Sequence, residues 1–82
     1  MLPVVKSSRR NLATAREVLA VNMIRLRRDR QWSQELLAAE AGLHRTFIAH
    51  LERLVRNPSL DNVEKIAKAF GVSVWEILKP PQ

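Results

Sequence analysis

The sequence has no cysteine and no tyrosine, and only two of its 82 residues are glycine. Without cysteine the chain can form no disulfide bond, thiolate nucleophile or Cys-rich zinc site. The two glycines lie far apart, which excludes a glycine-rich phosphate loop. No apolar run approaches the ~20 residues that span a bilayer, and no secretory signal pattern opens the chain. We therefore expect a cytoplasmic protein with no membrane partner.

Catalytic and metal-binding patterns are also missing. Serine, histidine and aspartate all occur, but no arrangement of an activated nucleophile can be recognised. His44 and His50 lie six residues apart without a carboxylate at ligand spacing, so we predict no metal site and no cofactor. A chain of 82 residues makes one domain and leaves no room for a separate catalytic one. We expect that the protein is not an enzyme.

Positive charge is present in excess, with a formal net charge of +6 at pH 7 and a pI near 11.2. Residues 1–30 carry eight basic and two acidic residues, whereas residues 31–82 carry six of each. The excess of positive charge has two interpretations of equal weight. It favours binding of a polyanionic partner, or it is a solvated basic surface that only keeps the protein soluble. Residues 1–12 hold Lys6, Arg9 and Arg10 without a clean apolar period, and we predict a flexible basic arm there.

After this arm, apolar residues recur with a period near 3.6, and no stretch alternates as a strand does. The pattern predicts an all-α fold, a compact bundle of five helices. We place them at about residues 14–29, 34–41, 45–53, 60–70 and 74–78. Because Pro80 and Pro81 end any helix, we expect a domain over residues 13–79 and a short tail over residues 80–82.

The helix boundaries rest on capping residues. Three serines are good N-caps, the third of them in an S-x-x-E capping box: Ser33, Ser59 and Ser73. Gly42 and Gly71 follow the last apolar residue of their helices, where a glycine adopts the left-handed conformation without strain. Local chemistry alone therefore predicts where three helices begin and where two end.

The most specific stretch covers residues 34–52, where a tight turn joins two short helices. Ala38 stands at the expected crossing of these helices, where a larger side chain would push them apart. Gly42 and Leu43 follow after a short gap, with apolar residues on both inner faces. This spacing predicts a helix-turn-helix motif, and an ordinary αα-hairpin is the alternative.

The second helix of this motif begins against the usual rules. Helix N-termini favour Ser, Asp or Asn at the cap and acidic residues in the first turn, because the helix dipole is positive there. Here His44 stands at the cap and Arg45 follows it. Such rule-breaking often marks function, although Arg45 could also be a solvated residue offset by a nearby carboxylate.

From about residue 16 to residue 78 the sequence resembles the lambda repressor/Cro-type (XRE) helix-turn-helix family. The matching stretches are Ile24–Arg27, Trp32–Gln34, Ala38 with Gly42-Leu43, Arg45–Ile48, Leu51–Arg53, Arg56–Ser59 and Gly71–Val74. The resemblance implies a lambda-repressor-like five-helix domain that binds double-stranded DNA, usually as a homodimer. Small members include controller proteins of restriction–modification systems and antitoxins, and residues 44–48 are similar to the controller pattern.

The resemblance also assigns roles to individual residues. The recognition helix of this family lies in the major groove, so the base-reading residues are His44, Arg45, Thr46 and His50. Arg45 is the side chain we expect to read guanine through O6 and N7. The residues expected to hold backbone phosphates are Gln34, Arg53, Arg56 and Asn57. In the arm, Lys6, Arg9 and Arg10 are expected to follow a phosphate backbone or to enter the minor groove.

Some apolar residues fall outside the expected core. Trp75 lies on the outer side of the last helix, where it is either simply exposed or forms the dimer interface. Val21 and Ile24 lie on the outer face of the first helix, either exposed or covered by apolar residues of the arm (Leu2, Val4 and Val5). Leu54-Val55 replaces the glycine that usually ends the recognition helix, so that helix runs longer or the two residues pack into the core or an interface.

These observations predict a sequence-specific transcriptional regulator that acts as a homodimer on a palindromic operator through the major groove. We expect a protein of a prokaryote or phage, associated with the nucleoid. The alternative is an antitoxin that binds a toxin partner and regulates its own promoter.

Overall fold

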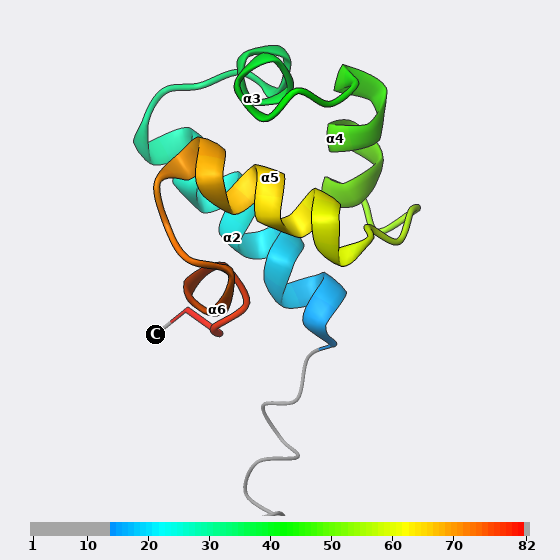
Figure 1. Cartoon of the computed structure of the whole chain (residues 1–82), viewed down its shortest axis with the longest axis vertical. Coiled ribbons are helices and arrows are strands. Elements are labelled where there is room, and N and C mark those ends of the chain that lie inside the picture. Colours follow the sequence, from blue (N-terminus) through cyan, green and yellow to red (C-terminus); the bar gives the residue numbers. More distant parts are fainter. Residues whose placement is uncertain (1–13, 82) are drawn as a thin grey trace, which may run out of the picture.

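The structure is a computed structural model that describes residues 14–81, so the predicted arm lies outside the described residues. This part of the chain is all-helical, as predicted. Its elements are α2 (Ala15–Asp29), α3 (Gln34–Ala41), α4 (Arg45–Glu52), α5 (Leu60–Phe70) and α6 (Val74–Ile77). In Figure 1, α5 crosses in front of α2, with α3 and α4 above this crossing and α6 below it. None of these helices is long and apolar enough to cross a membrane.

The predicted caps determine the helix boundaries. Hydroxyl oxygens at four N-caps each accept a hydrogen bond from the backbone N–H three residues further on: those of Thr14, Ser33, Ser59 and Ser73. The Ser73 backbone N–H and hydroxyl also donate to the Glu76 carboxylate, which lowers the pKa of that carboxyl group. Gly42 and Gly71 take the left-handed conformation, with φ of 70° and 76°. The three serine caps and the two glycine ends are confirmed, and Thr14 is a further cap that was not predicted.

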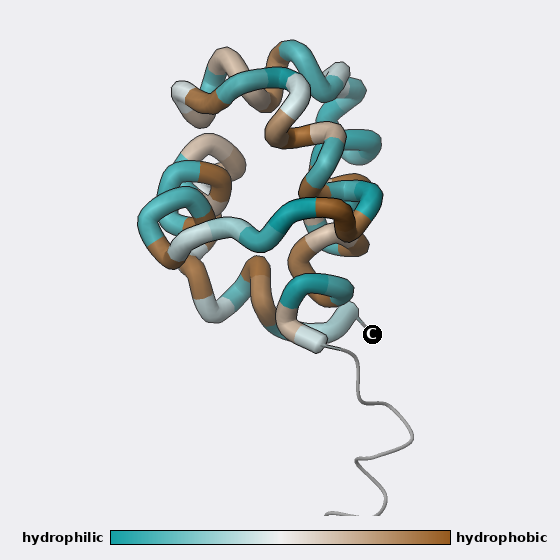
Figure 2. The backbone as a smooth tube through the Cα atoms, turned by 90° about the vertical axis from the view of Figure 1, so that its right-hand side faces the viewer, coloured by the Kyte–Doolittle hydropathy of each residue, from teal (hydrophilic) through white to brown (hydrophobic). Residues whose placement is uncertain are grey.

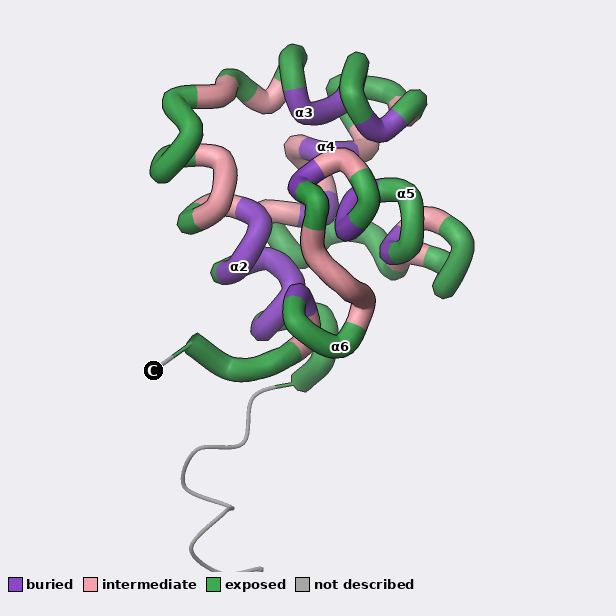
Figure 3. The backbone as a smooth tube through the Cα atoms, turned by 60° about the vertical axis from the view of Figure 1, so that its left-hand side comes forward, coloured by how far each residue is buried: buried purple, intermediate pink, exposed green. Residues whose placement is uncertain are grey.

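One apolar core joins the helices. Hydrophobic and hydrophilic stretches recur in turn along the helical part of the chain (Figure 2), and the buried residues gather where α2, α3, α4 and α5 face one another (Figure 3). The fully enclosed apolar side chains are Met23, Leu37, Ile48, Ile66 and Ile77. Phe47 is only half-buried, at the edge of the core, with the guanidinium group of Arg56 over its ring. The core therefore holds α4 mainly by Ile48 and Leu51.

Helix α4 does not continue through Leu54 and Val55. Helix α4 ends at Glu52, and Leu54 takes a left-handed conformation with a φ of 63°. The Val55 N–H donates to the His50 carbonyl, so the turn closes as it does at a glycine cap. Leu54 and Val55 are 40% and 55% exposed, so neither a longer helix nor core packing is correct. A non-glycine residue at this position costs roughly 1–2 kcal/mol of strain.

A buried asparagine attaches the last helix to the first. Asn22 lies on α2 and is fully buried, and its Nδ2 donates to the Ile77 and Lys79 carbonyls at 2.7 and 2.9 Å. Its Oδ1 accepts from the Arg25 guanidinium at 3.2 Å. The last carbonyls of a helix have no partner within that helix, so Asn22 supplies donors that α6 lacks.

We expect Asn22→Ala to lower the free energy of unfolding by about 2 kcal/mol, because it leaves two carbonyl groups without these donors. Urea denaturation followed by circular dichroism measures the change. Asn22→Asp separates hydrogen bonding from side-chain volume, since it keeps the shape but removes the donors. It should destabilise at least as much as the alanine variant, and near-wild-type stability of Asn22→Asp would contradict this role.

Candidate nucleic-acid interface

Helices α3 and α4 form the predicted helix-turn-helix. Ala38 is 3% exposed at the place where the two helices pack, as the spacing predicted. Gly42 ends α3, and the Leu43 N–H returns to the Ala38 carbonyl at 2.9 Å. A Cβ added at Gly42 would meet no atom within 4 Å, so the positive φ, not a lack of space, favours glycine here. This tight turn sets α4 at a fixed angle to α3.

The N-terminal turn of α4 is the exposed end of the motif. His44, Arg45 and Thr46 are all exposed there. The His44 side chain makes no capping hydrogen bond, and the first turn contains no acidic residue. In the other four helices within residues 14–81, a hydroxyl caps the N-terminus. The first amide groups of α4 therefore receive no side-chain cap, and helix N-termini of this kind attract anionic groups.

His50 lies apart from this exposed turn. It is half-buried, and its Nδ1 is a buried atom with no hydrogen-bond partner in the part of the chain that the structure describes. The structure thus gathers three of the four predicted base-reading residues at one end of α4 and leaves His50 further along, less accessible.

A charged network beneath the motif holds α4 in place. The Glu52 carboxylate is 4% exposed and accepts two hydrogen bonds from the Arg27 guanidinium of α2, from Nε and one terminal nitrogen, both at 2.9 Å. It also accepts one from Nε2 of Gln34 at the start of α3, at 2.9 Å. Arg27 donates further to the Trp32 carbonyl at 3.0 Å. One carboxylate therefore connects α2, α3 and α4.

The network keeps Arg27 charged and orients Gln34. The hydrogen-bonded carboxylate of Glu52 raises the pKa of Arg27 above its already high ordinary value. The Gln34 amide uses one N–H on Glu52, and its second N–H donates to no group within residues 14–81. Gln34 is half-buried at the N-terminal end of α3, so its predicted role toward a phosphate stays a proposal.

Sequence reasoning missed this network, although a signal for it was present. Arg27 follows the buried Met23 by four residues, and Glu52 follows the buried Ile48 by the same interval. Residues four apart share a helix face, so both charges fall on inward faces. A charged residue at such a position indicates a buried partner of opposite charge.

The other predicted phosphate-binding residues lie around the C-terminal end of α4. Arg53 is its C-cap residue, and Arg56 and Asn57 follow in the loop to α5; all three are exposed. The Arg56 guanidinium lies over the Phe47 ring, 5.3 Å from its centre, which holds the charge beside α4. This contact keeps the Arg56 guanidinium close to the helix-turn-helix motif.

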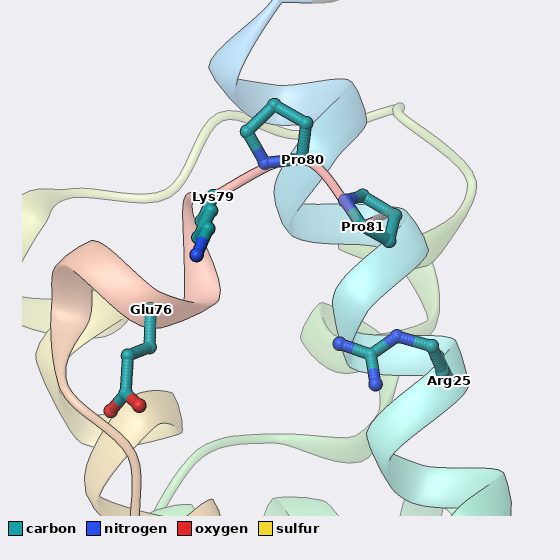
Figure 4. Close-up of a pocket in the computed structure, with 5 residues that line it drawn as sticks. All are labelled: Arg25, Glu76, Lys79, Pro80 and Pro81. Atoms are coloured by element: carbon teal, nitrogen blue, oxygen red, sulfur yellow. The ribbon is translucent and has the colours of Figure 1, made fainter.

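Three surface hollows lie away from these residues. One is formed by α2 and the end of α6, with Arg25, Lys79 and Glu76 around Pro80 and Pro81 (Figure 4). A second lies between the end of α3 and α5, and a third lies along α2. None of the three is lined by a predicted DNA-contacting residue. Residues 14–81 contain no group of three metal-ligating side chains arranged to hold an ion.

Comparison with known proteins supports this assignment of the motif. A family model described as helix-turn-helix matches residues 23–76. The chain is 48% identical over 67 residues to a hypothetical transcription factor of Neisseria meningitidis serogroup B, covering 82% of this chain and 63% of that protein. It is 53% identical over 58 residues to control protein C.BamHI of Bacillus amyloliquefaciens, covering 71% and 70%.

A solved structure shares the fold. The restriction–modification controller protein C.AhdI of Aeromonas hydrophila superimposes with a TM-score of 0.72 at 34% identity, over 76% of this chain and 94% of the controller. The chain spans less than two thirds of the Neisseria relative, which continues beyond the matched region.

Proposed function

Since the chain belongs to the helix-turn-helix family of DNA-binding transcription regulators, we propose that it reads a palindromic operator as a homodimer through the major groove. The observation that carries the proposal is the N-terminal turn of α4. It is exposed, has no side-chain cap and carries Arg45 where an acidic residue is usual. Recognition helices of this motif contact base edges with their N-terminal residues.

The proposed contacts follow the geometry of the motif. Arg45 donates two hydrogen bonds to guanine O6 and N7, and Thr46 meets a thymine methyl group or donates a hydrogen bond. His44 stands next to them, and His50 takes a secondary part because it is half-buried. Phosphate contacts come from Arg53, Arg56, Asn57 and the second N–H of Gln34, and these position the protein without specifying sequence.

Fewer observations support the proposed roles of the N-terminal arm and of a protein partner. Lys6, Arg9 and Arg10 lie outside the described residues, so their contact with DNA stays a prediction. The antitoxin alternative also stays a prediction, since no observation within residues 14–81 favours a toxin partner. The similarity to controller proteins supports the proposal of a transcriptional regulator instead.

Selection of bound sequences from a random DNA pool tests the proposed function. We expect an enriched motif with two-fold symmetry and half-sites about 34 Å apart, one turn of DNA. Competition at fixed salt with random DNA supplies the control, because non-specific binding shows no sequence preference. The absence of any enriched motif would overturn the proposal, and an asymmetric motif would overturn the homodimer.

For the dimer interface we propose Trp75 on α6, which is 77% exposed. Buried tryptophans dominate many interfaces, so Trp75→Ser should weaken the dimer by roughly 30-fold or more. Sedimentation equilibrium measures the dissociation constant. Leu36→Ser is the matched control, because it removes another exposed apolar side chain from a different face. Equal effects of the two substitutions would exclude Trp75 as the specific contact.

A further inference from the structure

The outer face of α2 carries four residues at the spacing of a helix–helix seam. Glu17, Val21, Ile24 and Arg28 follow one another at intervals of four, three and four residues. This is the spacing of the a and d positions along which two helices pack. Val21 is 47% exposed, Glu17 and Arg28 are exposed, and Ile24 is half-buried, so within residues 14–81 most of this face is open to solvent.

These four residues match the same four residues of a second copy when the two α2 helices run in opposite directions. In an antiparallel pair with the two-fold axis midway between residues 22 and 23, Val21 lies opposite Ile24 of the second copy. Glu17 then lies opposite Arg28 of that copy. An a position faces a d position in both pairs, and each pair occurs twice because of the symmetry. A parallel pair would place Glu17 against Glu17 and Arg28 against Arg28, which is repulsive.

The charges at both ends are available for a partner. One oxygen of Glu17 accepts from the Thr14 N–H in the capping box, and the other accepts nothing from residues 14–81. The Arg28 side chain donates no hydrogen bond within the same residues, whereas Arg27 beside it donates to Glu52 and to the Trp32 carbonyl. A shallow hollow lined by Val21, Ile24 and Arg28 runs along the helix, bounded by Arg25 and Asp29. It can accept side chains from a facing helix.

We propose that this face of α2 binds the same face of a second copy of the chain in antiparallel orientation. From Glu17 to Arg28 the contact spans about 17 Å of helix. It involves far fewer residues than the 20–30 on each side of a stable interface, so it forms only at high local concentration. If the dimer proposed through α6 also forms, the two different two-fold contacts together give closed tetramers or open chains. Only this consequence rests on the proposed α6 dimer; the α2 contact does not.

Cysteine cross-linking tests the orientation, because the natural chain has no cysteine. Val21→Cys and Ile24→Cys variants are mixed in equal amounts and oxidised mildly. The two variants differ in mass, so mass spectrometry separates the mixed product from the two symmetric ones. We expect the 21–24 product at several times its statistical share. Glu64→Cys on the exposed side of α5 is the control and should cross-link far more slowly.

Exchange of the charges tests the pairing. Arg28→Glu and Glu17→Lys should each lower the rate of 21–24 cross-linking by roughly tenfold, because attraction becomes repulsion at two places. The double variant should restore the rate of 21–24 cross-linking to within about twofold of the rate without charge changes. If the single variants had lost the rate by unfolding, the double variant would not restore it. The Trp75→Ser variant should keep the cross-link, so failure here is distinct from failure of the α6 dimer. Excess symmetric products, a rate equal to that of Glu64→Cys, or no recovery in the double variant would overturn the proposal.

Discussion

Glu52→Ala is expected to lower the free energy of unfolding by about 3–5 kcal/mol, a large part of the stability of a domain of this size. The Glu52 carboxylate accepts three hydrogen bonds, two from Arg27 and one from Gln34. The Arg27 side chain is only 15% exposed, so removal of the carboxylate leaves a largely buried guanidinium without its counter-charge. The midpoint of thermal unfolding should fall by more than about 12 °C.

Calorimetry and urea denaturation measure this loss, and two variants identify its cause. Glu35→Ala removes an exposed carboxylate from α3 and should change stability by less than about 0.5 kcal/mol. The double variant Arg27→Met/Glu52→Leu removes both charges and should recover most of the loss, because an apolar pair leaves no unpaired charge. A double variant less stable than Glu52→Ala would show that the charges are not coupled.

Arg45→Ala is expected to relax base preference at one position of each half-site. A bidentate arginine–guanine contact is worth about 1–3 kcal/mol of discrimination, and the proposed homodimer has two such contacts. Specific affinity should therefore fall by about 2–6 kcal/mol, while binding to random DNA changes little. Fluorescence anisotropy on the selected operator, and on operators changed at single positions, measures both quantities.

Arg53→Ala is the matched control, because it also removes one exposed arginine from α4 and its boundary. As a proposed phosphate contact, Arg53 should weaken binding to all sequences alike and reduce the salt dependence by about one charge per protomer. If Arg45→Ala behaved in the same way, with the selected motif unchanged, Arg45 would be a phosphate contact and not a base-reading residue.

The helix boundaries could be predicted because their causes are local. Ser33, Ser59 and Ser73 accept hydrogen bonds from amides three residues away, and Gly42 and Gly71 adopt a conformation that depends on their own lack of a Cβ. The end of α4 at Glu52 lies within one residue of the predicted end at 53, but the turn that follows it could not be predicted. Leu54 takes the left-handed conformation at a cost in strain, in a turn closed by the hydrogen bond from the Val55 N–H to the His50 carbonyl.

One part of the candidate site could likewise be predicted from the sequence, and the other part depends on the tertiary structure. The exposure of His44, Arg45 and Thr46 followed from the register of α4, since Ile48 and Leu51 determine which side of that helix is buried. The lesser accessibility of His50 depends on its surroundings in the fold, which the period of one helix does not describe. The structure also shows that Arg56 lies over Phe47, a contact between a loop and a helix.

The amino-acid sequence by itself determined the helical class, the helix-turn-helix spacing and the residues at the exposed end of α4, because periodicity and capping act over four residues or fewer. Only the tertiary structure decided that Glu52 joins α2, α3 and α4 and that Asn22 attaches α6 to α2. Those partners lie 18 to 55 residues apart. Charges and amides at such separations meet only after the apolar faces have packed, and burial then makes each contact obligatory.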